Sequence, residues 1–266
     1  METYFDPELN PNPEVQFYII DMKKGDVTGD GVIDEVYLLG TKPSNDKGPN
    51  FFDDITVAIV DGKIKKTTYL RFKFNAGYNP KLLLTRFTDN PSLDIFLVIQ
   101  TPSEPGKEIY YLFSAVDNKL KSLFNFLAFD EYSEYRVVFN DNYIVTVTNI
   151  RSGKTFIIDI SFRPKSYLST IYDSKGKTKG IYEGDVLSLG ILTPIDINFD
   201  GVNELLAIQK IVGISNKDVL GYVQTFLKFN GNEFIPDATL VSIQGTQVNL
   251  PKVNTPTTND LRKKKK

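Results

Sequence analysis

Apolar and polar residues alternate along short stretches of this chain, and the stretches end at residue pairs that are typical of turns. Four such stretches, at residues 55–60, 110–116, 143–150 and 226–229, end at the pairs Asp61-Gly62, Asp117-Asn118, Ser152-Gly153 and Asn230-Gly231. An alternation with a period of two places successive side chains on opposite faces of a strand. Asp, Asn and Gly tolerate the positive φ of tight hairpin turns. The pattern therefore predicts four β-hairpins, each closed by a two-residue turn, in an all-β fold.

A second pattern, an acidic loop between two apolar stretches, occurs three times. Residues 17–20, 81–84 and 185–189 precede loops at Asp26, Asp89 and Asp196, and residues 36–39, 95–99 and 205–208 follow them. The spacing from the last acid of each loop to the next turn is similar, from 34 to 61, from 94 to 117 and from 204 to 230. A unit of about four strands in roughly 50–60 residues has the size of a propeller blade. We expect a propeller-like array of four-stranded antiparallel sheets with four or five blades, and a β-sandwich pair fits the length almost as well.

The same pattern sets the expected domain boundaries. Residues 1–245 are predicted to form a single propeller-like β-domain. Residues 165–185 break the alternation, and we interpret them as an insertion with a short helix at 166–172. Residues 246–266 are mostly polar and end in a basic run, so we interpret them as a solvated, Lys-rich tail.

Composition excludes several functional classes. The chain has 266 residues, of which 41% are hydrophobic, and a formal net charge of −2, so it offers a large core but no broad positive field for nucleic acid. It contains no Cys and no His, which removes disulfides, thiolate chemistry and histidine-dependent catalysis. No apolar run is long enough to predict a membrane span. We therefore favour a protein without catalytic activity and expect a monomer.

Two of the acidic loops carry oxygen-bearing side chains at the first, third, fifth and ninth positions and a glycine at the sixth. Alternate side chains of such a tight loop converge on one point, and the residue after the glycine offers its backbone carbonyl. This arrangement suits a structural Ca²⁺ ion, which takes oxygen ligands from several sides. The predicted ligands are Asp26, Thr28, Asp30, Val32 and Asp34 in the first loop and Asp196, Asn198, Asp200, Val202 and Glu204 in the second.

The loops also admit an interpretation without metal. Asp and Asn side chains accept hydrogen bonds from nearby backbone N–H groups in Asx turns. An EF-hand is excluded, because Tyr37 and Ala207 stand where that loop needs a glutamate and both flanks are predicted strands. The middle loop, residues 89–94, is shorter and lacks the glycine. We expect it to keep the turn without an ion.

The two complete loops resemble the FG-GAP and VCBS repeats of secreted bacterial propellers and of the integrin α-subunit head. In those repeats the motif Asp-x-Asn-x-Asp-Gly-x-x-Asp-Leu holds calcium between strands, and Thr28 and Glu204 depart from it here. The resemblance implies a calcium-stabilised, propeller-like protein. Weak sites with dissociation constants of about 10⁻⁴–10⁻³ M suit extracellular calcium. We therefore expect a secreted or cell-surface protein whose signal peptide is absent from this sequence, because the first residues have no apolar segment.

Three functions are consistent with these patterns. The favoured one is an exported, non-enzymatic calcium-binding module that binds a protein or a cell-envelope polymer. The alternatives are a polysaccharide-active lyase or hydrolase that uses carboxylate, Tyr or Lys chemistry, and a structural protein of the envelope or spore layer. Seven tyrosines are available to stack on sugar rings, although packing between sheets is the simpler interpretation. They are Tyr69, Tyr78, Tyr110, Tyr111, Tyr132, Tyr135 and Tyr143.

Overall fold

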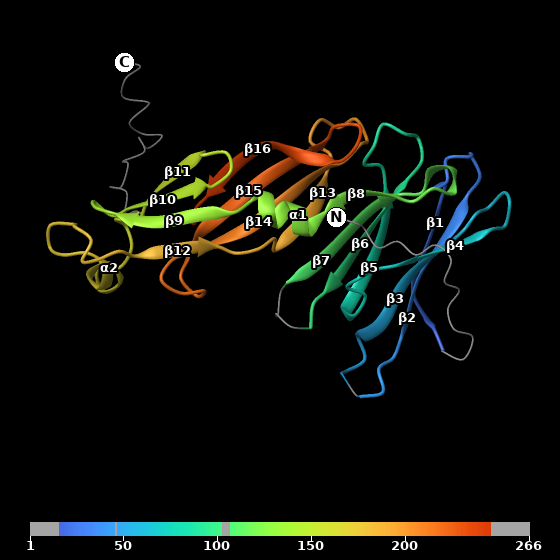
Figure 1. The fold of residues 1–266 in the computed structure, drawn as a ribbon, viewed down its shortest axis with the longest axis horizontal. Coiled ribbons are helices and arrows are strands. Elements are labelled where there is room, and N and C mark those ends of the chain that lie inside the picture. The colour runs from blue at the N-terminus through green and yellow to red at the C-terminus, as the bar shows by residue number, and fades with distance from the viewer. Residues whose placement is uncertain (1–15, 46, 103–106, 246–266) are drawn as a thin grey trace, which may run out of the picture.

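A computed structural model describes residues 16–45, 47–102 and 107–245 of the chain. The described residues form two sheets of eight strands each, together with two short α-helices. The sheets follow one another along the long axis of the molecule, and the chain completes the first sheet before it enters the second (Figure 1). The all-β prediction is confirmed. The 246–266 tail lies outside the described residues.

The first sheet consists of two four-stranded meanders. Their strands are β1 (Tyr18–Gly25), β2 (Asp34–Thr41), β3 (Phe51–Val60), β4 (Thr67–Arg71), β5 (Gly77–Thr85), β6 (Asp94–Gln100), β7 (Glu108–Ser114) and β8 (Lys121–Asn125). Within each meander, consecutive strands pair antiparallel. Strand β3 connects the meanders, because its end residues Phe51 and Phe52 pair with β5 while the rest of the same strand pairs with β4. Between the two pairing regions, Asp54 has a left-handed backbone with φ 50°.

The two meanders of the first sheet pack face to face on one apolar core. Val36 and Leu38 of β2 and Ile59 of β3 lie in the same buried cluster as Leu97 of β6 and Phe113 of β7. Strand β2 alternates between buried and partly exposed positions along its whole length. That alternation is the period-two pattern of the sequence, and it gives each strand one core-facing side.

The second sheet has the order β11-β10-β9-β12-β14-β15-β16, with β13 beside β14. Its strands are β9 (Tyr135–Asn140), β10 (Ile144–Asn149), β11 (Thr155–Asp159), β12 (Glu183–Val186), β13 (Ile191–Ile195), β14 (Glu204–Val212), β15 (Val219–Phe229) and β16 (Phe234–Ser242). One buried cluster contains Val147 of β10, Ile158 of β11 and Val223 of β15, with Val241 of β16 packed against it. Residues from both ends of the sheet share this core, so the sheet curls until it is nearly a barrel.

The two helices lie at the ends of the second sheet. Helix α1 (Phe126–Tyr132) leads from the first sheet into β9, and the Asn125 side chain caps it by accepting from the Leu127 and Ala128 N–H groups. Helix α2 (Lys165–Ile171) lies within the segment that we interpreted as an insertion, close to the helix expected there. Its residue Ile171 is fully buried in the barrel-like core.

A third apolar cluster joins the sheets. Phe96 and Tyr110 of the first sheet and Phe129 of α1 pack in one buried cluster with Leu192 and Leu205 of the second sheet. Figure 1 shows α1, β8 and β13 at this junction. The two sheets therefore share a continuous hydrophobic contact. The described residues do not form four or five separate blades, because their sixteen strands divide between two sheets.

All four predicted hairpins are confirmed, but their turns are longer than two residues. The connections are residues 61–66 between β3 and β4, 115–120 between β7 and β8, 150–154 between β10 and β11, and 230–233 between β15 and β16. Asx turns extend two of these connections. The Asp61 carboxylate accepts from the Lys63 and Ile64 N–H groups, and the Asn230 carbonyl accepts from Asn232 and Glu233.

Candidate functional site: the acidic loops and the seam pocket

The first acidic loop is folded by hydrogen bonds from its own backbone to its carboxylates. Asp26 accepts from the N–H groups of Gly29 at 2.7 Å and Gly31 at 2.9 Å, and Asp30 accepts from Val32 at 2.9 Å. Gly29 and Gly31 have φ values of 79° and 83°, a conformation that glycine adopts without strain. The loop therefore consists of successive Asx turns.

Asp34, the last acid of this loop, is fully buried at the start of β2. Its Oδ2 accepts from the Val27 and Thr28 N–H groups, both at 2.9 Å, and its Oδ1 accepts from the Gly62 N–H at 2.8 Å. A Cβ atom at Gly62 would lie 2.1 Å from the Ile33 carbonyl oxygen, so the hairpin approaches this closely only with glycine. The Asp34 carboxylate thus ties the loop to the β3–β4 turn.

The second loop repeats this geometry. Asp196 accepts from the Gly201 N–H at 3.0 Å, Asp200 accepts from Val202 at 2.8 Å, and the final acid Glu204 accepts from Ile197 at 3.2 Å. These three bonds have the same sequence offsets as Gly31 to Asp26, Val32 to Asp30 and Val27 to Asp34 in the first loop. The two loops are therefore structurally equivalent, as their sequences predict.

The middle loop confirms the expected turn. Asp94 at the start of β6 is fully buried, and its Oδ2 accepts from the Phe87 N–H at 2.9 Å and the Thr88 hydroxyl at 3.4 Å. Burial raises the pKa of this carboxyl to about 6, and the hydrogen bonds from Phe87 and Thr88 act in the opposite direction. The acid that closes all three loops accepts from the N–H seven residues earlier.

The predicted metal ligands are engaged in hydrogen bonds within and beside their loops. Asn198 and Asp200 contact each other at 2.8 Å, whereas the other carboxylates bind backbone N–H groups, and Val32 and Val202 contribute N–H donors. Across residues 16–45, 47–102 and 107–245, no three His, Cys, Asp or Glu side chains gather to hold a metal ion. The prediction of a metal-binding group is therefore wrong for the described residues. The assignment of Ca²⁺ to the individual residues of the two loops stays a prediction, and the hydrogen bonds within these loops are those of Asx turns.

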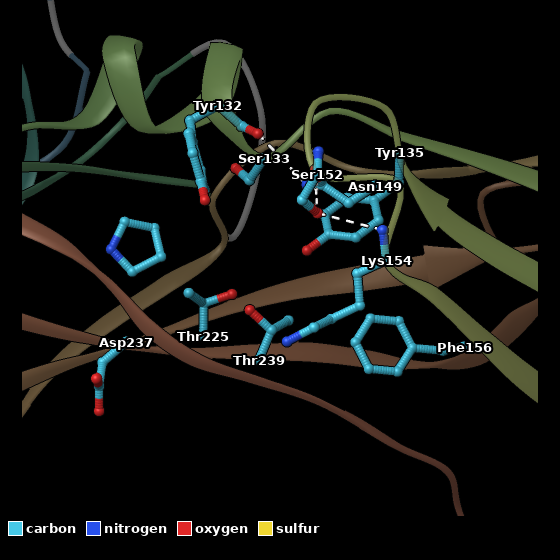
Figure 2. Close-up of a pocket in the computed structure, with 11 residues that line it drawn as sticks. Tyr132, Ser133, Tyr135, Asn149, Ser152, Lys154, Phe156, Thr225, Asp237 and Thr239 are labelled. Carbon is cyan, nitrogen blue, oxygen red and sulfur yellow. Dashed lines mark hydrogen bonds between the residues drawn. The ribbon is translucent and has the colours of Figure 1, made fainter.

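A small polar pocket lies at the seam of the curled second sheet, where the β9–β11 hairpins face β15 and β16. We call it the seam pocket. Its volume is about 100 Å³. Figure 2 shows side chains from these elements and from the end of α1 around one space. The lining residues are Tyr132, Ser133, Tyr135, Asn149, Ser152, Lys154, Phe156, Thr225, Pro236, Asp237 and Thr239.

The floor of the seam pocket is a buried network of hydrogen bonds. Asn149 and Thr225 are almost fully buried and line the pocket beside Tyr135. Burial raises the pKa of Tyr135, and the polar side chains of Asn149 and Thr225 act in the opposite direction. Asn149 also accepts from the Ser152 N–H at 2.8 Å and the Ser152 hydroxyl at 2.9 Å. The floor is therefore fixed before any ligand arrives.

The rim of the seam pocket carries an uncompensated positive charge. In Figure 2 the Lys154 side chain crosses the pocket, and the Tyr132 hydroxyl points into it, whereas the Asp237 carboxylate points away. Within the described residues, Lys154 makes no ion pair and no side-chain hydrogen bond. The exposed Tyr132 and half-buried Phe156 add aromatic surface. The pocket thus presents one ammonium, several hydroxyls and two rings.

Sequence reasoning found only part of this pocket. Tyr132 and Tyr135 were among the tyrosines considered for stacking, but Asn149, Lys154 and Thr225 were not singled out. The turn at 150–154 supplies Lys154, and β15 supplies Thr225 from the opposite end of the sheet. Only the curling of the sheet brings these residues together, and no local sequence motif predicts that curling.

Comparisons with known proteins identify relatives. Residues 133–242, which contain almost all of the seam pocket, match the YybI C-terminal domain. The protein named "Uncharacterized protein YybI" from Bacillus subtilis (strain 168) is 37% identical over 230 residues, which cover 86% of this chain and 87% of that protein. No solved structure matches the chain. Within the described residues, the model has no helix of the length and apolarity needed to cross a membrane.

These relatives correct the resemblance to VCBS and FG-GAP repeats. The matching family is YybI rather than either repeat family. The resemblance rested on the spacing of oxygen side chains in strand-flanked loops and on the hairpins near them, and such spacing also arises where Asx turns close a loop between two strands.

Proposed function

The chain belongs to the YybI family, and from the geometry of its seam pocket we propose that it is a non-catalytic binding protein for an anionic sugar residue. The observation that carries the proposal is the Lys154 ammonium, which has no partner in the described residues and lies over a fixed floor of hydroxyl and amide groups. An ammonium in such a position favours an anion, since a charge-assisted hydrogen bond is stronger than a neutral one.

The neutral groups of the pocket favour a hydroxyl-bearing ligand. The side chains of Tyr132 and Thr239 offer hydroxyls that donate as well as accept, and the rings of Tyr132 and Phe156 suit the apolar face of a sugar. The buried Ser133 hydroxyl donates to the Phe129 carbonyl at 2.6 Å. An apolar cavity of about 150 Å³ holds a benzene molecule. The seam pocket, at about 100 Å³, is smaller than that, so it suits only the acid end of one sugar, with the rest of the ring outside. We propose a uronic acid of a cell-envelope polysaccharide as the ligand class.

The lining does not support glycoside hydrolysis. That chemistry needs two carboxyl groups that face each other across the bond that is cleaved. Asp237 is the single acid that lines the seam pocket among the described residues, and it points away from the space (Figure 2). A binding role therefore suits this pocket better than a polysaccharide-cleaving one.

Glucuronate is the probe that tests this proposal. Lys154→Gln should weaken glucuronate binding by about tenfold or more, because it removes a charge-assisted hydrogen bond of about 1.5–3 kcal/mol. Wild-type protein should bind glucose, which lacks the carboxylate, no better than the variant binds glucuronate. Isothermal titration calorimetry measures each affinity, and circular dichroism verifies the fold of each variant.

A matched control removes a lysine elsewhere. Lys81 on β5 is exposed and lies in the other sheet, so Lys81→Gln changes the net charge equally without touching the pocket. We expect wild-type affinity from this control. Equal binding of glucose and glucuronate, or an equal loss in Lys81→Gln, would contradict the proposal.

A further inference from the structure

A second cavity lies at the junction of the two sheets, where strand β14 changes partner. The last residues of β14, Ile211 and Val212, pair with β12, whereas its earlier residues, from Glu204 to Ile208, pair with β13. Residues 187–190 connect β12 to β13 and belong to neither strand, so they lie between the two regions in which β14 is paired. We call them the junction segment. The gap that they leave beside β14 forms part of the cavity, which we call the junction cavity.

The junction segment is held to both sheets. On the side of the second sheet, the Leu187 N–H donates to the Lys210 carbonyl at 2.9 Å and the Gly190 N–H donates to Ile208 at 3.1 Å. On the side of the first sheet, the Leu189 N–H donates to Asp130 at 2.7 Å. The Tyr110 hydroxyl, which shares its one proton between Glu108 and the Gly190 carbonyl, lies 3.1 Å from the Gly190 oxygen. These bonds fix the segment, so the cavity wall is preformed.

The junction cavity combines apolar walls with positive charge. Its volume is about 540 Å³, which lies within the range of about 300–1,000 Å³ for small-molecule sites. Among the described residues, four aliphatic side chains and one aromatic ring line it together with two lysines and no acid. The lining residues are Lys107, Leu187, Ser188, Leu189, Gly190, Ile191, Ile208, Lys210, Asn216 and Tyr222.

The acids near the junction cavity are engaged elsewhere. Glu108 accepts from the Tyr110 hydroxyl at 2.6 Å, and Asp130 accepts from the Leu189 N–H. Burial raises the pKa of Asp130, and the neighbouring Lys107 charge acts in the opposite direction. The positive charge of Lys107 therefore already interacts with the Asp130 carboxyl. Lys210 is half-buried and makes no ion pair or side-chain hydrogen bond within the described residues, so it is the main anion-binding group.

We propose that the junction cavity binds a small amphipathic carboxylate, with its apolar body against the aliphatic walls and its carboxylate on Lys210. The aliphatic walls favour a hydrocarbon body because they bury apolar surface. The two lysines favour a negative head group. The ligand class differs from that of the seam pocket, and the two pockets share no residue.

Decanoate is the probe for this proposal, and calorimetry below its micelle concentration measures the affinity. We expect decanoate to bind, whereas decanol and decyltrimethylammonium, which have the same chain length, should bind at least about tenfold more weakly. Lys210→Gln should weaken decanoate binding by about tenfold, and Lys210→Arg should restore most of it, because arginine keeps the charge. Circular dichroism verifies that each variant is folded.

Two control variants locate the ligand. Lys73 lines a neighbouring cavity that also includes Lys107, and Lys154 lines the seam pocket. Lys73→Gln and Lys154→Gln should both keep wild-type affinity for decanoate. The proposal is overturned if decanoate does not bind, if decanol binds equally well, or if Lys73→Gln weakens binding while Lys210→Gln does not. Because Lys154→Gln reports on the seam pocket alone, failure of one proposal leaves the other intact.

Discussion

Asp34→Ala is expected to lower the free energy of unfolding by about 4 kcal/mol. The substitution leaves the buried N–H groups of Val27 and Thr28 and the partly buried N–H of Gly62 without their acceptor, and each unsatisfied buried donor costs about 1–3 kcal/mol. The loss is a large part of the roughly 5–15 kcal/mol that stabilises a typical domain. Urea denaturation followed by circular dichroism measures it.

Asp30→Ala is the matched control for this prediction. Asp30 lies in the same loop and accepts from the Val32 N–H at its exposed tip, so its loss should cost less than about 1 kcal/mol. The difference between the two variants should be the same in calcium and in a chelator, because N–H groups hold the Asp34 carboxylate. Equal losses in both variants, or a difference that appears only with calcium, would contradict the account of these loops.

Asp94 should make the protein less stable as the pH rises from 4 to 7. Its pKa is about 6 in the folded protein, above the value of 3.8 for an ordinary Asp, so the folded state binds the proton more tightly than the unfolded state. The stability that Asp94 contributes is fully present below its pKa in the unfolded protein and is lost as the pH rises through its pKa in the folded protein. The loss is about 3 kcal/mol at pH 7.

Comparison of the wild-type protein with Asp94→Asn isolates this effect. The asparagine does not titrate, so the stability of the wild type relative to this variant should fall between pH 4 and pH 7. Asp61 provides a control of opposite sign, because the hydrogen bond from Asn118 lowers its pKa. The contribution of Asp61 should therefore be lost as the pH falls. A stability difference between wild type and Asp94→Asn that does not change with pH would refute the assignment.

Local structure was predictable from the sequence where a single stretch of chain decides it. Period-two alternation located the hairpin strands, and the pairs Asp61-Gly62 and Asn230-Gly231 marked two of the turns. The turn lengths were not predictable from these pairs, because the Asp61 and Asn230 side chains bind N–H groups further along the chain. Side chains that compete for backbone donors lengthen a turn.

The arrangement of the meanders was not predictable in the same way. The sequence indicates repeated four-stranded units, and consecutive antiparallel pairing of β1 to β4 and β5 to β8 agrees with that. Whether such units form separate blades depends on contacts between them. Here Phe51 and Phe52 pair with β5 and join two meanders into one sheet. Nothing local in those residues indicates a change of partner.

One sequence spacing is compatible with two structures, so the sequence predicts a metal-binding group where the described residues form none. Oxygen side chains at alternate positions with a glycine suit a calcium loop and a series of Asx turns alike. The Gly62 N–H, which comes from the next hairpin, binds Asp34 and favours the second structure. The expectation of export, which rested on weak calcium sites, stays a prediction. The YybI relationship, which replaces the VCBS resemblance, is consistent with this correction.

An NMR titration of the isotope-labelled protein with glucuronate tests the central claim most directly. The claim is that the curled second sheet forms a binding pocket for an anionic sugar at its seam. We predict that the shifted backbone amides cluster at residues 133–135, 149–154, 225 and 237–239, and that Lys154→Gln reduces these shifts. Shifts concentrated at the acidic loops 26–34 and 196–204, or no shifts with glucuronate, would contradict the claim.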